Sequence, residues 1–303
     1  MRSSSVTFIT FTLLLASLLA ALITPLALAV DAGNELLAEP SSAMDTEPAI
    51  EHSTQPRTEQ ALIVLPSESA AAAEAQAERL ADQWDVILTN IVRDGLVDYS
   101  RAAKHPGFTT LIEELRQFDS SALNSRDATK AHLINLYNAM TVDLIVQHYP
   151  VSSIKRIGGW FSSPWDIEVA VFDQQKVTLD DIEHKLLRPM GDPRIHFAIN
   201  CASISCPVLL DKAFRALLLN QQLDEQRDAF LQSPRGVAFA NGKLEVSKIF
   251  RWFNEDWGGK AGVLKMLKQH HAEGARFSEI DGYLQYDWSL NKAEPAPTDI
   301  IAQ

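Results

Sequence analysis

Residues Leu133 to Val142 read LINLYNAMTV, and this apolar run is the strongest indication of how the chain folds. It lies within a longer segment, residues 127–148, that is apolar around most of a helical circumference. A helix that is apolar on all sides is buried, and Tyr149-Pro150 ends it because proline cannot continue a helix. The sequence therefore predicts a central, buried helix.

Two amides interrupt this apolar segment, Asn135 and Asn138. They are three residues apart and so lie on neighbouring positions of one helical face. A buried amide needs hydrogen-bond partners. We expect both amides to bond to a neighbouring loop, and the alternative is that they line a site.

The flanking segments alternate between helical and strand patterns. Apolar residues at helical spacing predict a helix from Ser67 that Gly95 ends, and further helices near residues 108–115, 212–231 and 247–253. Period-two alternation predicts hairpins over residues 167–179 and 237–246, the second around Asn241-Gly242, and single strands over residues 194–200 and 283–288. Helices interleaved with short hairpins define an α+β fold: a single domain with a buried central helix, several amphipathic helices and a small, mainly antiparallel sheet.

The N-terminal residues have the order of features that marks a secretory signal. Arg2 precedes an uncharged apolar run, residues 6–28, which closes with Ala27-Leu28-Ala29. Residues 1–29 are thus predicted to be a signal peptide, and the protein to be exported, periplasmic or secreted, with no stable membrane insertion after cleavage. The alternative is a membrane tether, because the run could nearly span a bilayer.

Composition divides the remainder of the chain. Residues 30–66 are rich in Ser, Thr, Pro and Glu and are predicted to be a disordered acidic spacer. Residues 67–291 form the globular domain, and residues 292–303 a loose tail.

The excess of acidic residues restricts the classes of partner that the protein is expected to bind. Lys and Arg number 27 against 39 Asp and Glu, a formal charge of −12. Such a field repels phosphate backbones, so nucleic acid is not expected as a partner. An unknown small molecule or protein remains, and no cofactor or resident metal is indicated.

The candidate chemistry centres on the two cysteines of the chain, Cys201 and Cys206. His184, His196 and Asn200 lie near them in the sequence. The predicted strand would place His196 and Asn200 on one face and direct Cys201 to the other.

Three interpretations of this cluster stay open. The cysteines form a disulfide that pins a tight loop, as an oxidising compartment favours. One cysteine is a nucleophile whose proton a histidine removes, with an amide such as Asn200 or Asn138 orienting the base. The histidines and cysteines bind zinc, although the cysteine spacing differs from that of common zinc sites.

Other polar and aromatic residues have simpler predicted roles. His132, His148, His270 and His271 are expected at the surface or at helix ends. The carboxylates of Asp180, Asp181 and Glu183 are expected to cap a short helix and to be solvated. The aromatic group is expected in the core rather than in a groove, and it comprises Phe250, Trp252, Phe253 and Trp257.

Several motifs resemble a known family, the domain-of-unknown-function family numbered 547. The similar segments include residues 97–99, 135–139, 179–188, 192–207, 246–253 and 286–291, so the resemblance spans about Trp84 to Asn291. It implies that the motif residues are Asn135, Asn138, His184, Arg188, His196, Asn200, Cys201, Cys206 and Pro207. Some family members are joined to glutaredoxin-type modules, which implies a thiol context. His132 and Leu133 depart from the family's aromatic positions.

The sequence favours a binding module with a disulfide-locked cysteine loop, in which Asn135, Asn138, Arg188 and Trp252 are candidate binding residues. The alternative is a thiol-dependent enzyme, whether hydrolase, transferase or redox enzyme. In that case Cys201 or Cys206 is the nucleophile and His196 or His184 the base, with Asn200 beside them.

Overall fold

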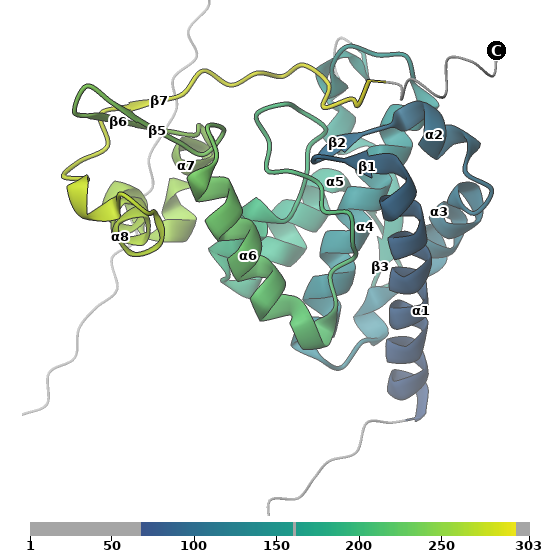
Figure 1. The fold of residues 1–303 in the computed structure, drawn as a ribbon. Coiled ribbons are helices and arrows are strands. Elements are labelled where there is room, and N and C mark those ends of the chain that lie inside the picture. The colour runs from purple at the N-terminus through teal and green to yellow at the C-terminus, as the bar shows by residue number, and fades with distance from the viewer. Residues whose placement is uncertain (1–67, 160–161, 295–303) are drawn as a thin grey trace, which may run out of the picture. The chain divides into compact units, whose positions relative to one another are not determined.

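The computed structural model describes residues 68–159 and 162–294, and its fold is α+β as predicted (Figure 1). The predicted signal peptide, the spacer and the tail beyond residue 294 lie outside the described residues. The helices are α1 (Glu68–Ile91), α2 (Tyr99–Lys104), α3 (Phe108–Gln117), α4 (Arg126–Gln147), α5 (Leu179–Asp181), α6 (Leu219–Gln232), α7 (Ile249–Trp252) and α8 (Gly259–His270).

The strands are short and form small sheets. Antiparallel pairs join β1 (Val92–Arg93) to β2 (Leu96–Val97) and β3 (Glu168–Phe172) to β4 (Gln175–Thr178). A three-stranded sheet contains β5 (Val237–Ala240), β6 (Lys243–Val246) and β7 (Gly282–Tyr283), with β5–β6 antiparallel and β6–β7 parallel. No helix within the described ranges is long and apolar enough to cross a membrane.

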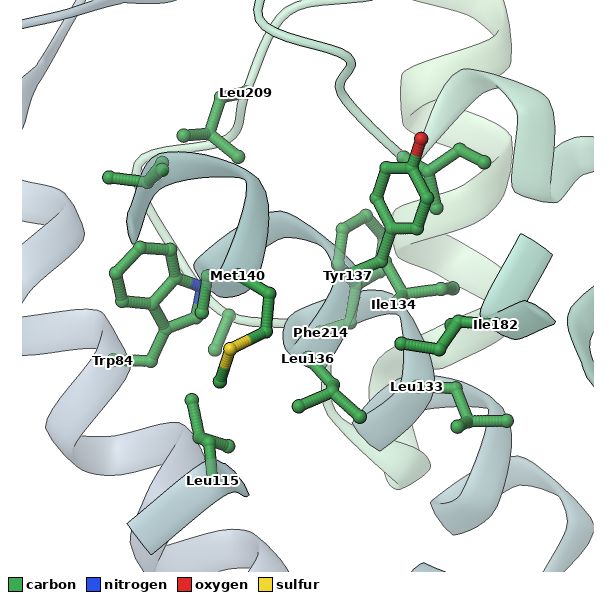
Figure 2. Close-up of a cluster of buried hydrophobic side chains, with 14 of the residues drawn as sticks. Trp84, Leu115, Leu133, Ile134, Leu136, Tyr137, Met140, Ile182, Leu209 and Phe214 are labelled. Atoms are coloured by element: carbon green, nitrogen blue, oxygen red, sulfur yellow. The ribbon is translucent and has the colours of Figure 1, made fainter. Parts of the chain in front are cut away.

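Helix α4 is the buried centre of the fold, as its sequence predicted. The Ser125 hydroxyl accepts a hydrogen bond from the Ala128 amide and caps the first turn. Every residue from 130 to 145 is buried. Figure 2 shows side chains of α4 meeting those of α1, α3 and the loop before α6, including Trp84, Leu115, Tyr137, Met140 and Phe214.

The domain has two apolar clusters. The larger surrounds α4 and contains residues of α1, α2, α3 and α5. The smaller contains Phe197, Phe230, Val246, Phe250 and Leu267, and joins the three-stranded sheet to α6, α7 and α8. In Figure 1 the two groups of elements lie on opposite sides of α6. Residues from both groups form the cavity described below.

Both predicted hairpins are present. Asn241 and Gly242 have φ values of 54° and 75°, as a two-residue turn with two left-handed positions requires. Asp173 and Gln174 make the same kind of turn between β3 and β4, with φ values of 49° and 60°.

The strand predicted over residues 194–200 is wrong. Residues Pro193–Phe197 form a 3₁₀ helix, η6, because the Asp192 carboxylate accepts from the Arg194 amide and Pro193 supplies a helical φ at the first position. His196 and Asn200 therefore do not share the face of a strand. These capping signals outweigh the apolar alternation.

Other boundaries also differ from the predictions. Asp94 and Gly95 do not end α1 but turn the chain between β1 and β2, with φ values of 51° and 73°. The helix predicted from residue 212 begins at Leu219. Of the strand predicted over residues 283–288 only Tyr283 is in β7, because later residues bond to the cysteine loop: the Ser205 amide donates to the Asp287 carbonyl.

Candidate functional site

The cysteine loop, residues 200–207, is held by the side chain of Asn200. Its amide nitrogen donates to the Pro207 carbonyl (2.7 Å), and its oxygen accepts from the Ala202 amide (2.9 Å). The same oxygen accepts from the Asn291 amide group at 3.2 Å. One buried side chain thus joins both ends of the loop and the C-terminal segment.

Asn138 fixes this arrangement to α4. Its amide nitrogen donates to the Ala198 carbonyl (2.9 Å) and its oxygen accepts from the Asn200 backbone amide (2.8 Å). Asn291 in turn accepts from the Tyr99 hydroxyl at 2.6 Å. We call Asn138, Asn200 and Asn291 the amide clamp. The expectation that Asn138 bonds to a neighbouring loop is confirmed.

Asn135 has a separate structural role. Its side chain makes two 2.9 Å hydrogen bonds with the backbone of Phe214 and so holds the segment before α6. It lies beside a second cavity, of ≈ 730 Å³, away from the cysteines. His132 lines that cavity too and is buried, which contradicts its predicted surface position. Burial lowers the pKa of His132 to about 4.

The two cysteines are adjacent but not bonded. Their sulfurs are 3.1 Å apart and both thiols are free, whereas a disulfide bond is about 2.05 Å long. The disulfide predicted from the sequence is therefore not formed in this structure. The backbone amide of Cys201 also donates to the Cys206 sulfur, at 3.1 Å.

The two thiols differ in exposure and acidity. Cys201 is half-buried, and its sulfur lies 3.2 Å from the Ser203 hydroxyl and 3.3 Å from the Tyr286 hydroxyl. The hydrogen bond with Cys206, with help from these hydroxyls, lowers the pKa of Cys201 to about 7. Cys206 is buried, and desolvation raises its pKa well above the ordinary thiol value.

His196 is held by a carboxylate that sequence reasoning missed, Asp256. Its Nε2 is 2.7 Å from the Asp256 carboxylate, which Arg188 also contacts through two hydrogen bonds of 2.8 and 2.7 Å. Arg188 lowers the pKa of Asp256 to about 2, so this carboxylate accepts and the His196 Nε2 carries the proton.

The other ring nitrogen of His196 is a free acceptor. Burial lowers the pKa of His196 to about 4, so the ring is neutral at pH 7 and Nδ1 has a lone pair. Nδ1 is buried and has no hydrogen-bond partner among the described residues. The ring stacks on Phe253, with centroids 4.0 Å apart.

Glu183 is buried rather than solvated, contrary to prediction. It lies in a π-helical turn, η4 (Ile182–Leu187), and only 8% of its surface is exposed. The Tyr137 hydroxyl donates to Oε2 at 3.3 Å, and Oε1 is 3.8 Å from the His196 Nδ1. Burial, followed by the charge of Cys201, raises the pKa of Glu183 to about 8, so the carboxyl group is mostly protonated at pH 7.

Asp180 and Asp181 lie at the start of α5, as predicted, but neither of them is its N-cap residue. Thr178 is the N-cap residue, and its hydroxyl accepts from the Asp181 amide while the Asp181 carboxylate accepts from the Thr178 amide. Asp180 is half-exposed and lies 3.5 Å from the His184 Nε2. The His184 Nδ1 pairs with Arg188 at 2.9 Å, so His184 lies in the same network as His196.

A cavity of ≈ 270 Å³ brings most of these groups together. Cys201, Cys206, His184, His196 and Glu183 all line it. Of the aromatic group, Trp252 and Phe253 line the cavity, Trp252 being 45% exposed, while Phe250 is in the core. The remaining lining residues are Tyr137, Ser163, Trp165, Asp180, Ile199, Ile249, Tyr286 and Trp288.

Metal-ligand geometry is not found in the parts of the chain that the structure describes. No three His, Cys, Asp or Glu side chains there gather around a common point. The His196 Nε2 is engaged by Asp256 and the His184 Nδ1 by Arg188.

The comparison with protein families identifies part of the chain. Residues 121–231 match the family described as "Protein of unknown function, DUF547", so this segment belongs to that family and the predicted resemblance is confirmed. The match is shorter than the resemblance predicted from the sequence. It includes both cysteines, the candidate site residues His184 and His196, and Arg188 and Glu183, and it ends before Trp252 and Asp256. No curated protein and no solved structure matches the chain.

Proposed function

We propose that the domain is a thiol-dependent redox enzyme that exchanges disulfides, with Cys201 as nucleophile and Cys206 as resolving thiol. The observation that carries the proposal is the 3.1 Å separation of two free sulfurs in the wall of a cavity. Closing this distance by about 1 Å forms a disulfide. The pair is therefore placed to pass between dithiol and disulfide with little rearrangement.

The environments of the two thiols support different roles for them. The half-buried Cys201, with a pKa of about 7, is substantially thiolate at neutral pH, and the thiolate is the attacking species. Cys206 is buried and its pKa is raised, so it stays protonated until a disulfide has formed beside it.

The amide clamp argues against a loop that needs a disulfide lock. Asn200 already joins the two ends of the loop, and Asn138 ties it to α4. A buried, satisfied amide network fixes its segment without a covalent bond. The sequence favoured a binding module in which a disulfide holds the cysteine loop, but the amide clamp already holds this loop without one.

The partners of the sulfurs argue against a cysteine–histidine hydrolase. The Cys201 sulfur contacts Cys206, Ser203 and Tyr286. Across the described residues no imidazole hydrogen-bonds either sulfur, whereas a histidine-activated thiol requires that contact. The group that lowers the pKa of Cys201 is the second thiol.

The reaction balances with a disulfide substrate, R–S–S–R′, and a thiol reductant. The Cys201 thiolate attacks one sulfur, the S–S bond breaks, and R′–S⁻ leaves and takes the proton of Glu183. The Glu183 carboxylate then accepts the proton of Cys206, whose thiolate attacks the Cys201 sulfur and releases R–S⁻. The substrate is reduced by two electrons, the Cys201–Cys206 disulfide forms, and an external thiol reduces it.

Reaction with the neutral disulfide dithiodipyridine tests this assignment, with released thiopyridone and intact mass as readouts. Wild type should release two equivalents and become lighter by two hydrogens. Cys206→Ser should release one equivalent and keep the adduct, and Cys201→Ser should react slowly. A stable adduct on wild type, as on Cys206→Ser, would mean that Cys206 does not resolve.

A further inference from the structure

The cavity has an aromatic wall next to the nucleophile. The ring of Trp252 lies 4.8 Å from that of Tyr286 and 5.7 Å from that of Trp288, and the Tyr286 and Trp288 centroids are 4.6 Å apart. Trp165 meets the edge of Trp288 at 6.0 Å. We call Trp165, Trp252, Tyr286 and Trp288 the aromatic wall.

This wall is adjacent to the reacting sulfur. The Tyr286 hydroxyl is 3.3 Å from the Cys201 sulfur. A group that rests on Tyr286 and Trp252 is therefore attached within a few atoms of any sulfur that Cys201 attacks.

The wall already binds a cation. The ammonium group of Lys155 lies over the Trp288 ring, 4.5 Å from its centroid. Indole rings attract cations through the negative face of their π-system, and Trp is the strongest of the aromatic side chains in this respect. Lys155 is exposed and is not among the described residues that line the cavity, whereas Trp252 and Trp165 line it, so a ligand in the cavity contacts these two rings.

The charges around the cavity also favour a cation. No lysine or arginine is among the described residues that line it, and these include the half-exposed carboxylate of Asp180. The nearby guanidinium of Arg188 is engaged by the Asp256 carboxylate through two hydrogen bonds. The Cys201 thiolate adds a negative charge at neutral pH.

We propose that the aromatic wall is the binding site for an organic cation, an ammonium or quaternary ammonium group, on the substrate whose sulfur Cys201 attacks. This inference rests on the proposed thiol–disulfide function. It names the substrate class: small disulfides or other activated sulfur compounds that bear a cationic group about two carbons from the sulfur.

Alkyl methanethiosulfonates of different charge test the proposal on Cys206→Ser, where the adduct cannot be resolved. The Cys201 thiolate attacks the sulfenyl sulfur, the mixed disulfide forms, and methanesulfinate leaves. The probes are the trimethylammonium-ethyl, the methyl and the sulfonatoethyl reagents. Each rate is divided by the rate with mercaptoethanol, which removes the intrinsic reactivity of the reagent.

The normalised rate should be at least about fivefold higher for the cationic reagent than for the neutral one, and lowest for the anionic reagent. Adding Trp252→Leu, or separately Trp288→Leu, should reduce the cationic-to-neutral ratio severalfold. Asp180→Asn should reduce it less. The exposed carboxylate of Glu113, on α3, supplies the control: Glu113→Gln removes the same charge and should leave the ratio unchanged.

The outcomes separate the two proposals. If Cys201 of the wild-type protein reacts with the neutral reagent no faster than an ordinary thiol, the redox function fails. If it reacts fast without preferring the cation, the function stands and the cation site is overturned. A preference that both tryptophan variants retain would come from the net charge of the chain, and this also overturns the site.

Discussion

Two polar clusters flank the cysteine loop, and they differ in how completely they are satisfied. In the amide clamp, the side-chain amides of Asn138 and Asn200 are each hydrogen-bonded through both oxygen and nitrogen. In the second cluster, the acid–imidazole cluster of Glu183, His196 and Asp256, the His196 Nδ1 has no hydrogen-bond partner among the described residues and Glu183 has a strongly raised pKa.

The difference separates structure from chemistry. A buried network with all its bonds made fixes a backbone in one conformation. A buried acceptor with no partner costs free energy, so its presence in a cavity wall indicates a group that interacts with a ligand. Four substitutions test this division, in order of decreasing expected effect.

Asn200→Ala should cause the largest loss of stability. It removes the hydrogen bonds to Pro207, Ala202 and Asn291 and leaves buried groups unpaired. We expect urea unfolding to show a loss of about 3–5 kcal/mol. The matched control is Asn254→Ala, which removes an exposed 3.5 Å contact and should cost less than about 0.5 kcal/mol. Similar losses in both variants would contradict a structural clamp.

Glu183→Gln should change how stability depends on pH. The pKa of Glu183 is about 8 in the folded protein, above the ordinary value of 4.5. From pH 4.5 to 8 the unfolded chain loses this proton while the folded protein keeps it, so wild type loses stability as pH rises. The variant lacks this loss and should gain about 3–4 kcal/mol relative to wild type between pH 5 and pH 8.

The pH difference is measured by urea unfolding of both proteins at the two pH values. Because the pKa of His196 is lowered in the folded state, His196 increases the free energy of unfolding as the pH rises. It does so in both proteins, so its contribution cancels when wild type is subtracted from the variant. A constant difference between variant and wild type would mean that Glu183 is ionised in the folded protein.

Asp256→Asn should lower the free energy of unfolding by less than Asn200→Ala does. It removes the charge that both Arg188 and His196 contact, and we expect a loss of about 2 kcal/mol in urea unfolding. The exposed pair of Lys176 and Glu168 gives the comparison, since solvent screens it and Glu168→Gln should leave the unfolding midpoint almost unchanged. Equal effects would remove the distinction between a supported cluster and a surface ion pair.

Cys206→Ser should have the smallest effect, a rise of about one unit in the pKa of Cys201. The hydrogen bond with Cys206 is the largest contribution that lowers this pKa, and a hydroxyl stabilises a thiolate less well in this position. Iodoacetamide alkylation as a function of pH measures the shift. If the pKa of Cys201 is unchanged in the variant, then Ser203 and Tyr286, and not Cys206, lower it.

The sequence predicted the core more accurately than the site. The apolar residues of α4 and the turn at Asn241-Gly242 are local sequence signals. They correctly predicted the buried helix and the β5–β6 hairpin. The sequence also indicated Cys201 and Cys206 as candidate site residues, because they are the only two cysteines of the chain. The strand over residues 194–200 was wrong because the capping by Asp192 and Pro193 opposes the apolar alternation.

The residues missed are those that tertiary structure brings to the cavity. Glu183 was assigned to a solvated run because two of its neighbours are helix-end carboxylates. Its burial depends on Tyr137 of α4, 46 positions away. Asp256 and Tyr286 lie 60 and 85 positions from His196 and Cys201, and no local pattern links them.

The activated Cys201–Cys206 dithiol is best tested by the alkylation rate of each cysteine in the reduced wild-type protein between pH 5 and pH 10, resolved by peptide mass spectrometry. We predict that labelling of Cys201 is half-maximal near pH 7, while Cys206 stays unlabelled until far more alkaline pH. Equal labelling of both thiols with a midpoint near the ordinary value of about 8.5 would contradict an activated dithiol.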